Sequence, residues 1–163
     1  MHIIMVRVYL ELSTLIALAN SFDLFHDETK EFLKEIKHLG FEPISCKQAV
    51  EMDLAIGVAR RPFRVTDALR IMEAIDTCGI RLLNTQSRTL LLLVEEYLKE
   101  TPLKIGDLLH YAGATLLGAD YLASWNTDDF NPRSEKSVNK VNRRKNLKTI
   151  KVGTPTKIIE WVS

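Results

Sequence analysis

Residues 105–130 (IGDLLHYAGATLLGADYLASWNTDDF) constrain the fold of this chain more than any other stretch of its sequence. The part from 108 to 118 is apolar nearly all round, so a helix there must be covered by other elements on most sides. Asp107 stands at the position of a helix N-cap, and Gly118 is a typical helix end. Residues 121–125 then form the short apolar run of an interior parallel strand. We therefore expect one buried helix that leads into one buried strand.

Polar side chains follow this strand at its C-terminal end, where open α/β sheets bind ligands. They are Asn126, Asp128 and Asp129. An earlier predicted strand, residues 5–10, ends at Glu11, and an acid inside such an apolar run needs a partner. Both strands therefore lead to acids.

The rest of the sequence alternates predicted strands with predicted helices. Further strands are expected at 43–45, 80–83 and 149–152, and helices from about Ser13 and at 27–40, 46–59, 66–79, 85–100, 134–145 and 155–161. Hairpin signals are absent from the sequence, so the pattern predicts an α/β fold of three layers, α/β/α, with a mainly parallel sheet of four to five strands. A length of 163 residues with 46% hydrophobic content fits a single domain, residues 1–163.

Charge and cysteine content narrow the function classes. The chain has 22 Lys+Arg and 21 Asp+Glu, but residues 133–151 hold eight basic residues and one acid, so one end is basic. Arg7 and Glu11 interrupt the apolar N-terminal segment, which argues against a membrane span. Cys46 and Cys78 have neither zinc-site spacing nor a disulfide pattern. We expect a cytoplasmic protein without membrane contact.

Several carboxylates fall at one edge of the predicted sheet. The first candidates are Glu11, Asp107, and either Asp128 or Asp129. Glu51 is a further candidate, because the helix that follows the second strand starts at the same edge, and Asp53 competes with it. Carboxylates a few Å apart repel and raise one another's pKa, which folding alone rarely favours. A divalent cation reverses that balance, and Mg²⁺ or Mn²⁺ prefers oxygen ligands and activates water.

Each candidate can also be interpreted as a residue with a structural role only. Asp107 alone fits a helix N-cap, and Glu51 alone fits a solvated helix residue. His110, one turn after Asp107, fits a packed or supporting residue better than a ligand. Trp125 fits the core, and Asn126 fits a residue that orders a turn or a metal-bound water.

These segments resemble the PIN-domain ribonucleases, the PilT N-terminal family, which includes the VapC-type toxins of toxin–antitoxin pairs. Residues 8–20 (VYLELSTLIALAN) resemble the family's opening, and residues 106–130 resemble its third-acid helix and the following strand. Residues 44–55 (ISCKQAVEMDLA) are similar to the second-acid helix and place the family's glutamate on Glu51. Residues 138–162 resemble the family's C-terminal end.

The sequence departs from the family pattern at two of these positions. The first acid is usually Asp and is Glu11 here. The usual aspartate after the fourth strand is Asn126 here, so that Asp129 is left as the fourth acid.

The resemblance implies a Mg²⁺- or Mn²⁺-dependent ribonuclease, an endonuclease on single-stranded RNA, with an antitoxin protein as a partner. The implied residues are Glu11, Glu51 and Asp107 as metal ligands, Asp129 as a further catalytic acid, and Ser13 and Asn126 in support. The alternative is a PIN-fold module that binds RNA or protein without catalysis, through its basic C-terminal region.

Two further expectations concern binding surfaces. Arg143, Arg144 and Lys145 follow a predicted helix beyond the acids and are expected to contact RNA phosphates. The helices predicted within residues 66–100 carry more apolar surface than one small sheet can cover, which predicts a homodimer.

Overall fold

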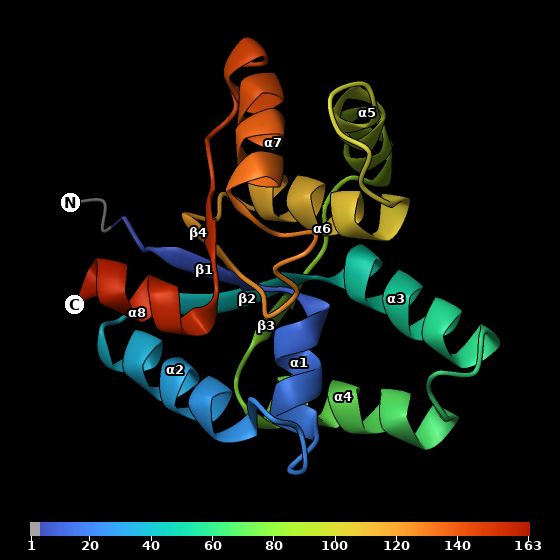
Figure 1. Ribbon diagram of the computed structural model, residues 1–163, viewed down its shortest axis with the longest axis vertical. Helices are drawn as coiled ribbons and strands as arrows, with labels where there is room; N and C mark the ends of the chain where they lie inside the picture. The colour runs from blue at the N-terminus through green and yellow to red at the C-terminus, as the bar shows by residue number, and fades with distance from the viewer. Residues whose placement is uncertain (1–3) are drawn as a thin grey trace.

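The computed structural model describes residues 4–163, in which a five-stranded parallel sheet lies between two layers of helices (Figure 1). The strands are β1 (Arg7–Leu10), β2 (Glu42–Cys46), β3 (Arg81–Leu83), β4 (Tyr121–Ala123) and β5 (Lys151–Gly153). The helices are α1 (Leu12–Ala19), α2 (His26–His38), α3 (Lys47–Ala59), α4 (Val65–Thr77), α5 (Ser87–Leu98), α6 (Ile105–Leu116), α7 (Pro132–Arg144) and α8 (Pro155–Val162). The predicted three-layer α/β/α architecture with a parallel sheet is confirmed.

The strand order β3-β2-β1-β4-β5 puts β1 at the centre. Tyr9 of β1 is in register with Ile44 of β2 on one side and with Leu122 of β4 on the other. The chain first builds the sheet outward from β1 in one direction and then crosses over to build it in the other. A crevice forms at the carboxyl ends of strands where the order reverses in this way, which here is the end of β1.

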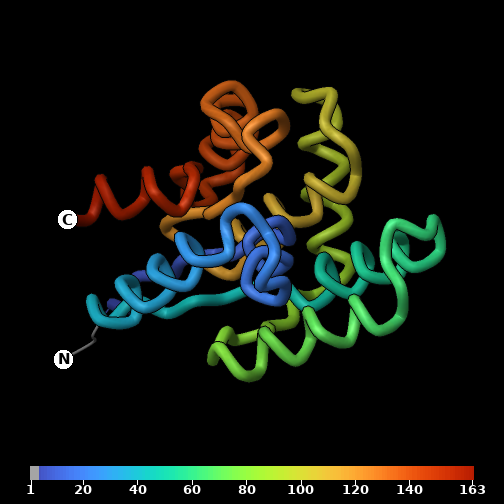
Figure 2. The backbone as a smooth tube through the Cα atoms, turned by 60° about the horizontal axis from the view of Figure 1, so that its bottom comes forward, coloured from blue at the N-terminus to red at the C-terminus, as the bar shows by residue number. Residues whose placement is uncertain are grey.

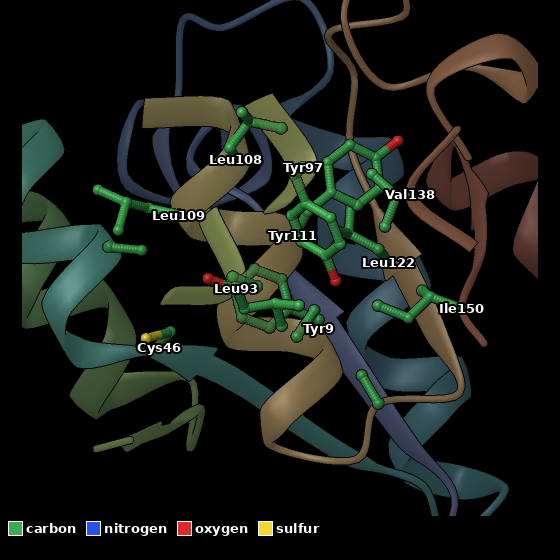
Figure 3. Packing of buried hydrophobic residues seen from close by; sticks show 14 of the residues in the cluster. Tyr9, Cys46, Leu93, Tyr97, Leu108, Leu109, Tyr111, Leu122, Val138 and Ile150 are labelled. Carbon is green, nitrogen blue, oxygen red and sulfur yellow. The ribbon is translucent and has the colours of Figure 1, made fainter. Parts of the chain in front are cut away.

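Side chains alternate between the two faces of the sheet and build two hydrophobic clusters. Tyr9 and Leu122 point to the cluster formed with α5, α6 and α7, part of which is drawn in Figure 3. Val8 and Leu10 point to the cluster formed with α1, α2, α4 and α8. Figure 2 shows the second view of this layering, with α5 and α7 together on one side of the sheet.

Helix α6 is the buried helix that its composition predicts, because every residue from 108 to 115 is buried. Gly113 allows its backbone to approach β2 closely. A Cβ at this position would stand 2.5 Å from Cys46 Cβ and 2.8 Å from its Sγ, closer than carbon and sulfur atoms can come. The glycine therefore lets α6 lie against the end of β2, with its first turn at the carboxyl edge of the sheet.

Three local expectations were wrong. Helix α6 begins at Ile105 with Lys104 at its N-cap, so Asp107 lies inside the first turn and is not the cap. Helix α7 begins at Pro132, two residues earlier than predicted, because the Asn131 side chain accepts the Ser134 N–H at 3.0 Å and caps it. Trp125 is only half-buried, with its ring stacked on another aromatic side chain at a centroid distance of 4.1 Å.

Two smaller observations bear on the sequence-based expectations. No helix within residues 4–163 has both the length and the apolar character that crossing a bilayer requires. Cys46 is buried and Cys78 is half-buried, and both are free thiols.

Candidate functional site

Glu11 lies at the carboxyl end of β1 and is buried, with 5% of its surface exposed. Its carboxylate accepts the Ser13 backbone N–H at 2.9 Å, the Ser13 hydroxyl at 2.8 Å and the Ser124 hydroxyl at 2.7 Å. These donors offset the cost of taking a carboxylate out of water. Glu11 also caps α1, so its position is fixed by both the strand and the helix.

The turn after β4 is joined to this carboxylate. Trp125 donates its backbone N–H to the Ser13 hydroxyl at 2.9 Å, and Asn126 donates its backbone N–H to the Ser124 hydroxyl at 3.0 Å. The side chain of Asn126 donates to Asp129 Oδ2 at 3.0 Å. Ser13 and Asn126 therefore lie where the sequence places supporting residues. Ser124 was not anticipated, because a serine that ends a buried strand carries no signal of its own.

Asp107 and Asp129 face the same region. One carboxylate oxygen of Asp107, Oδ2, is buried without a hydrogen-bond partner among residues 4–163. Burial, the neighbouring charge of Asp129 and then that of Glu11 raise the pKa of Asp107 to about 7. Asp129 is half-buried whereas Asp128 is exposed, so Asp129 is the residue of this pair that reaches the other acids.

Helix α3 directs Asp53, and not Glu51, toward these residues. Glu51 has 55% of its side chain exposed and pairs with Lys47 at 3.8 Å. Asp53 has only 17% of its side chain exposed and contacts His110 of α6. A Cβ on Gly106 would lie 3.3 Å from Asp53 Oδ1, so this carboxylate reaches the turn that carries Asp107. Two residues along a helix differ by about 200° in direction, which explains why Glu51 points away.

A buried hydrogen-bond chain fixes the Asp53 side chain. His110 is 1% exposed, and its Nε2 is bonded to Asp53 Oδ2 while its Nδ1 lies 2.7 Å from the Tyr9 hydroxyl. Burial raises the pKa of Tyr9 well above its ordinary value, so this hydroxyl keeps its proton and can donate to Nδ1 of a neutral imidazole or accept from Nδ1–H of an imidazolium. The proton on Nε2 is then directed to Asp53. Burial alone would lower the pKa of His110, but the bond to Asp53 and the surrounding carboxylates raise it.

Solved structures with a similar fold are known, although no similar sequence was found. No family profile matches the sequence, and no curated protein resembles it. VapC20 of Mycobacterium tuberculosis, described as a sarcin-ricin loop cleaving toxin, superposes with a TM-score of 0.53 at 14% identity, over 74% of this chain and 91% of that one. VapBC2 of Rickettsia felis, described as bound to a DNA fragment from its promoter, superposes with a TM-score of 0.55 at 12% identity, over 91% and 98%.

This chain has the PIN-domain fold. The resemblance drawn from the sequence is thereby confirmed at the level of the fold. In the PIN fold of this chain, the carboxyl ends of β1 and β4, the first turn of α6 and one side of α3 supply the acids described above.

The donor set of this PIN-fold site fits a divalent cation. All the candidate ligands are carboxylate oxygens, and the unpartnered Asp107 Oδ2 is the kind of atom that a cation would satisfy. Among the residues that the structure describes, however, no three acidic, histidine or cysteine side chains are already arranged to hold a metal. Binding of a cation would therefore require some side-chain movement, as expected when like charges repel. Mg²⁺ also keeps several waters and needs only one or two protein carboxylates.

The predicted phosphate contacts lie at the far end of α7. Arg144 pairs with Glu96 of α5 and with Glu100 just after it, both at 3.3 Å, and Lys145 follows the last turn of α7. The thirteen residues of α7 span roughly 20 Å, which separates this end from Asp129. The structure does not bring Arg143, Arg144 and Lys145 to the acids.

The raised pKa of Asp107 predicts how the metal-free protein responds to pH. The folded state holds the Asp107 proton up to about pH 7, whereas the unfolded chain releases it near its ordinary value of 3.8. The stabilisation is complete below pH 4 and is lost as pH rises to 7. Because Asp107 is only half-buried, we expect the loss to be on the order of 2 kcal/mol. Urea unfolding in chelator at pH 5 and pH 8 should show it in the parent but not in Asp107→Asn. Parallel profiles for the two proteins would contradict the assignment.

Proposed function

We propose that this protein is a Mg²⁺- or Mn²⁺-dependent ribonuclease that cleaves single-stranded RNA internally. Its metal-site carboxylates are Glu11, Asp53 and Asp107, with Asp129 as a fourth acid, and Asp53 takes the place that the sequence assigns to Glu51. The observation that carries the proposal is the convergence of Glu11, Asp107 and Asp129 at the carboxyl edge of the sheet, where burial and then the charges of Asp129 and Glu11 raise the pKa of Asp107.

The side chains around the acids are arranged to hold them in position. When bound, the cation would lower the pKa of a coordinated water and offset negative charge on the phosphate. Ser13 and Ser124 fix Glu11. Asn126 bonds one oxygen of Asp129, which leaves the other to accept a proton from an attacking water. His110 fixes the carboxylate of Asp53.

The proposal extends to partners and compartment. The fold neighbours are VapC-type proteins, and one of them is described as a VapBC complex, which supports an antitoxin protein as the partner of this chain. We propose a toxin of a toxin–antitoxin pair that acts in the cytoplasm, where free thiols such as Cys46 and Cys78 persist.

A cleavage assay separates this proposal from a binding module that lacks catalysis. Purified protein and a 5′-labelled single-stranded RNA are incubated with Mn²⁺, with Mg²⁺ or with chelator. We expect internal cleavage that the chelator abolishes. RNA binding without cleavage under any divalent condition would favour the binding module.

The homodimer remains a prediction. Of the helices within residues 66–100 that suggested it, we consider α5 as the interface. Helix α5 buries Leu90 and Leu93 in the core but leaves Leu91 and Leu92 exposed at 60% and 53%. We expect a dimer by light scattering at tens of micromolar, and monomers for Leu91→Glu/Leu92→Glu because buried charge opposes association. Leu39→Glu, on the opposite layer, is the matched control. A parent that stays monomeric would contradict the prediction.

A further inference from the structure

A groove runs beside α7 from the acids to the far end of the helix. Its first part, about 770 Å³, is bordered by Asp129, Lys104 and Arg133. Its second part, about 440 Å³, is bordered by Lys136, Lys140 and Arg143. Glu100 and Ser137 line both parts, so the two parts adjoin. We call this the α7 groove.

Four basic residues of α7 form one stripe along this groove. They are Arg133, Lys136, Lys140 and Arg143. Their spacing of three, four and three residues puts them on one face of the helix, and all four are exposed. The opposite face is buried through Val138 and Val141. The stripe extends over roughly 15 Å from its first to its last residue.

Most of the charge on this stripe is available to a ligand. Within residues 4–163, Lys140 alone of the four makes an ion pair, with Glu100 at 3.1 Å. Glu135, the acid nearest in sequence, instead accepts the Val152 backbone N–H at 2.8 Å on the β5 side. Arg144 also pairs with Glu100, so the acid that lines the groove is already compensated.

The two walls of the groove differ in chemistry. One wall is the basic stripe, and the other is the connection between α5 and α6, where the apolar Pro102 and Leu103 lie between polar residues and border the first part. Single-stranded nucleic acid has phosphates along one side and bases that can turn to the other. A groove with a cationic wall, and with a short apolar stretch opposite its first part, suits such a strand.

We propose that a single RNA strand lies in the α7 groove, with phosphates against Arg133, Lys136 and Arg143 and its scissile end at Asp129. This inference rests on the proposed ribonuclease function and gives the substrate its path. It also replaces the contact expected at residues 143–145: Arg143 remains a contact, while Arg144 forms ion pairs with Glu96 and Glu100.

The test is the salt dependence of RNA binding, measured in chelator so that no cleavage occurs. Affinity for a fluorescent single-stranded RNA is followed from 50 to 200 mM salt for the parent and for Arg133→Gln/Lys136→Gln/Arg143→Gln. Each phosphate contact contributes about 0.7 to the log–log slope, so loss of three should flatten it by about 2, a roughly twentyfold smaller change in affinity over this range.

Two controls make the result specific. The variant with Lys30→Gln, Lys34→Gln and Lys157→Gln removes the same charge from exposed residues of α2 and α8, in the other helical layer. The variant Arg144→Gln removes a paired charge at the end of α7. Both should keep the parent slope. RNA with uncharged methylphosphonate linkages on one side of the cleavage point should flatten the slope of the parent and leave that of the α7 variant unchanged.

The outcomes distinguish this inference from the function on which it rests. A parent that cleaves RNA, with an α7 variant that keeps the parent slope, would overturn the groove and leave the ribonuclease standing. An equal loss in the Lys30, Lys34 and Lys157 variant would also overturn it, because net charge alone would then explain binding. A parent that neither binds nor cleaves RNA would overturn both.

Discussion

Asp107→Asn is expected to abolish RNA cleavage, by more than about a hundredfold, while the metal-free protein stays at least as stable as the parent. Asparagine keeps an oxygen but not the negative charge that a divalent cation binds. Asp107 is not the N-cap of α6, so no helix cap is lost. Removing the negative charge of Asp107 also relieves its repulsion with Glu11 and Asp129. This relief is expected to raise the free energy of unfolding of the metal-free protein.

Thermal unfolding with and without Mn²⁺ tests this result beside the cleavage assay. A ligand that binds only the folded state stabilises it by about 4 kcal/mol at a thousand times its Kd, so Mn²⁺ should raise the Tm of the parent. The Tm of Asp107→Asn should not respond. Asp128→Asn, in an exposed acid near the same site, is the matched control and should behave as the parent. Cleavage by Asp107→Asn at the parent rate would rule out its catalytic assignment.

Asp53→Asn and Glu51→Gln are expected to differ by about a hundredfold in their effect on cleavage, with Asp53→Asn the damaging change. Asp53 reaches the first turn of α6, whereas Glu51 is exposed and its pair with Lys47 contributes less than about 1 kcal/mol to stability. Asparagine can still accept the His110 N–H, so the fold should persist. The charge that helps raise the pKa of His110 is gone, however, and that pKa should fall.

Histidine titration by NMR provides a readout of this second prediction that does not depend on activity. A lowered His110 pKa in Asp53→Asn and an unchanged one in Glu51→Gln would support the arrangement. If Glu51→Gln abolished cleavage and Asp53→Asn did not, the alignment of residues 44–55 with the second-acid helix would be right and the proposed role of Asp53 wrong.

The sequence predicts the fold and names three of the four acids of the candidate site, because both depend on local pattern. Parallel strands bring their carboxyl ends to one edge, so Glu11 and Asp129 must lie near each other once β1 and β4 are neighbours. The choice between Glu51 and Asp53 depends instead on the rotation of α3. That rotation is set by Ala49, which packs in one cluster, and by Val50 in the other. Such packing cannot be read from a motif.

Hydrogen bonds and ion pairs between residues far apart in the sequence limit what can be predicted from it in the same way. Ser124 donates a hydrogen bond to Glu11, 113 residues away, and no sequence pattern near either residue predicts this bond. The basic run at residues 133–151 gives a total charge, but Arg144 is paired because Glu96 and Glu100, which lie more than 40 residues earlier, are close to it in the fold. Only the folded arrangement distinguishes the charges that remain for a ligand.

The chain of hydrogen bonds from Tyr9 through His110 to Asp53 has a consequence for folding. Tyr9 and His110 are 101 residues apart, and His110 and Asp53 are 57 residues apart. The chain exists only when β1, α3 and α6 have all docked, because a partly assembled sheet leaves at least one of these groups unbonded. The proposed nuclease activity would therefore require that these three elements, far apart in the sequence, have packed together, and a growing polypeptide that has not yet reached α6 would lack it.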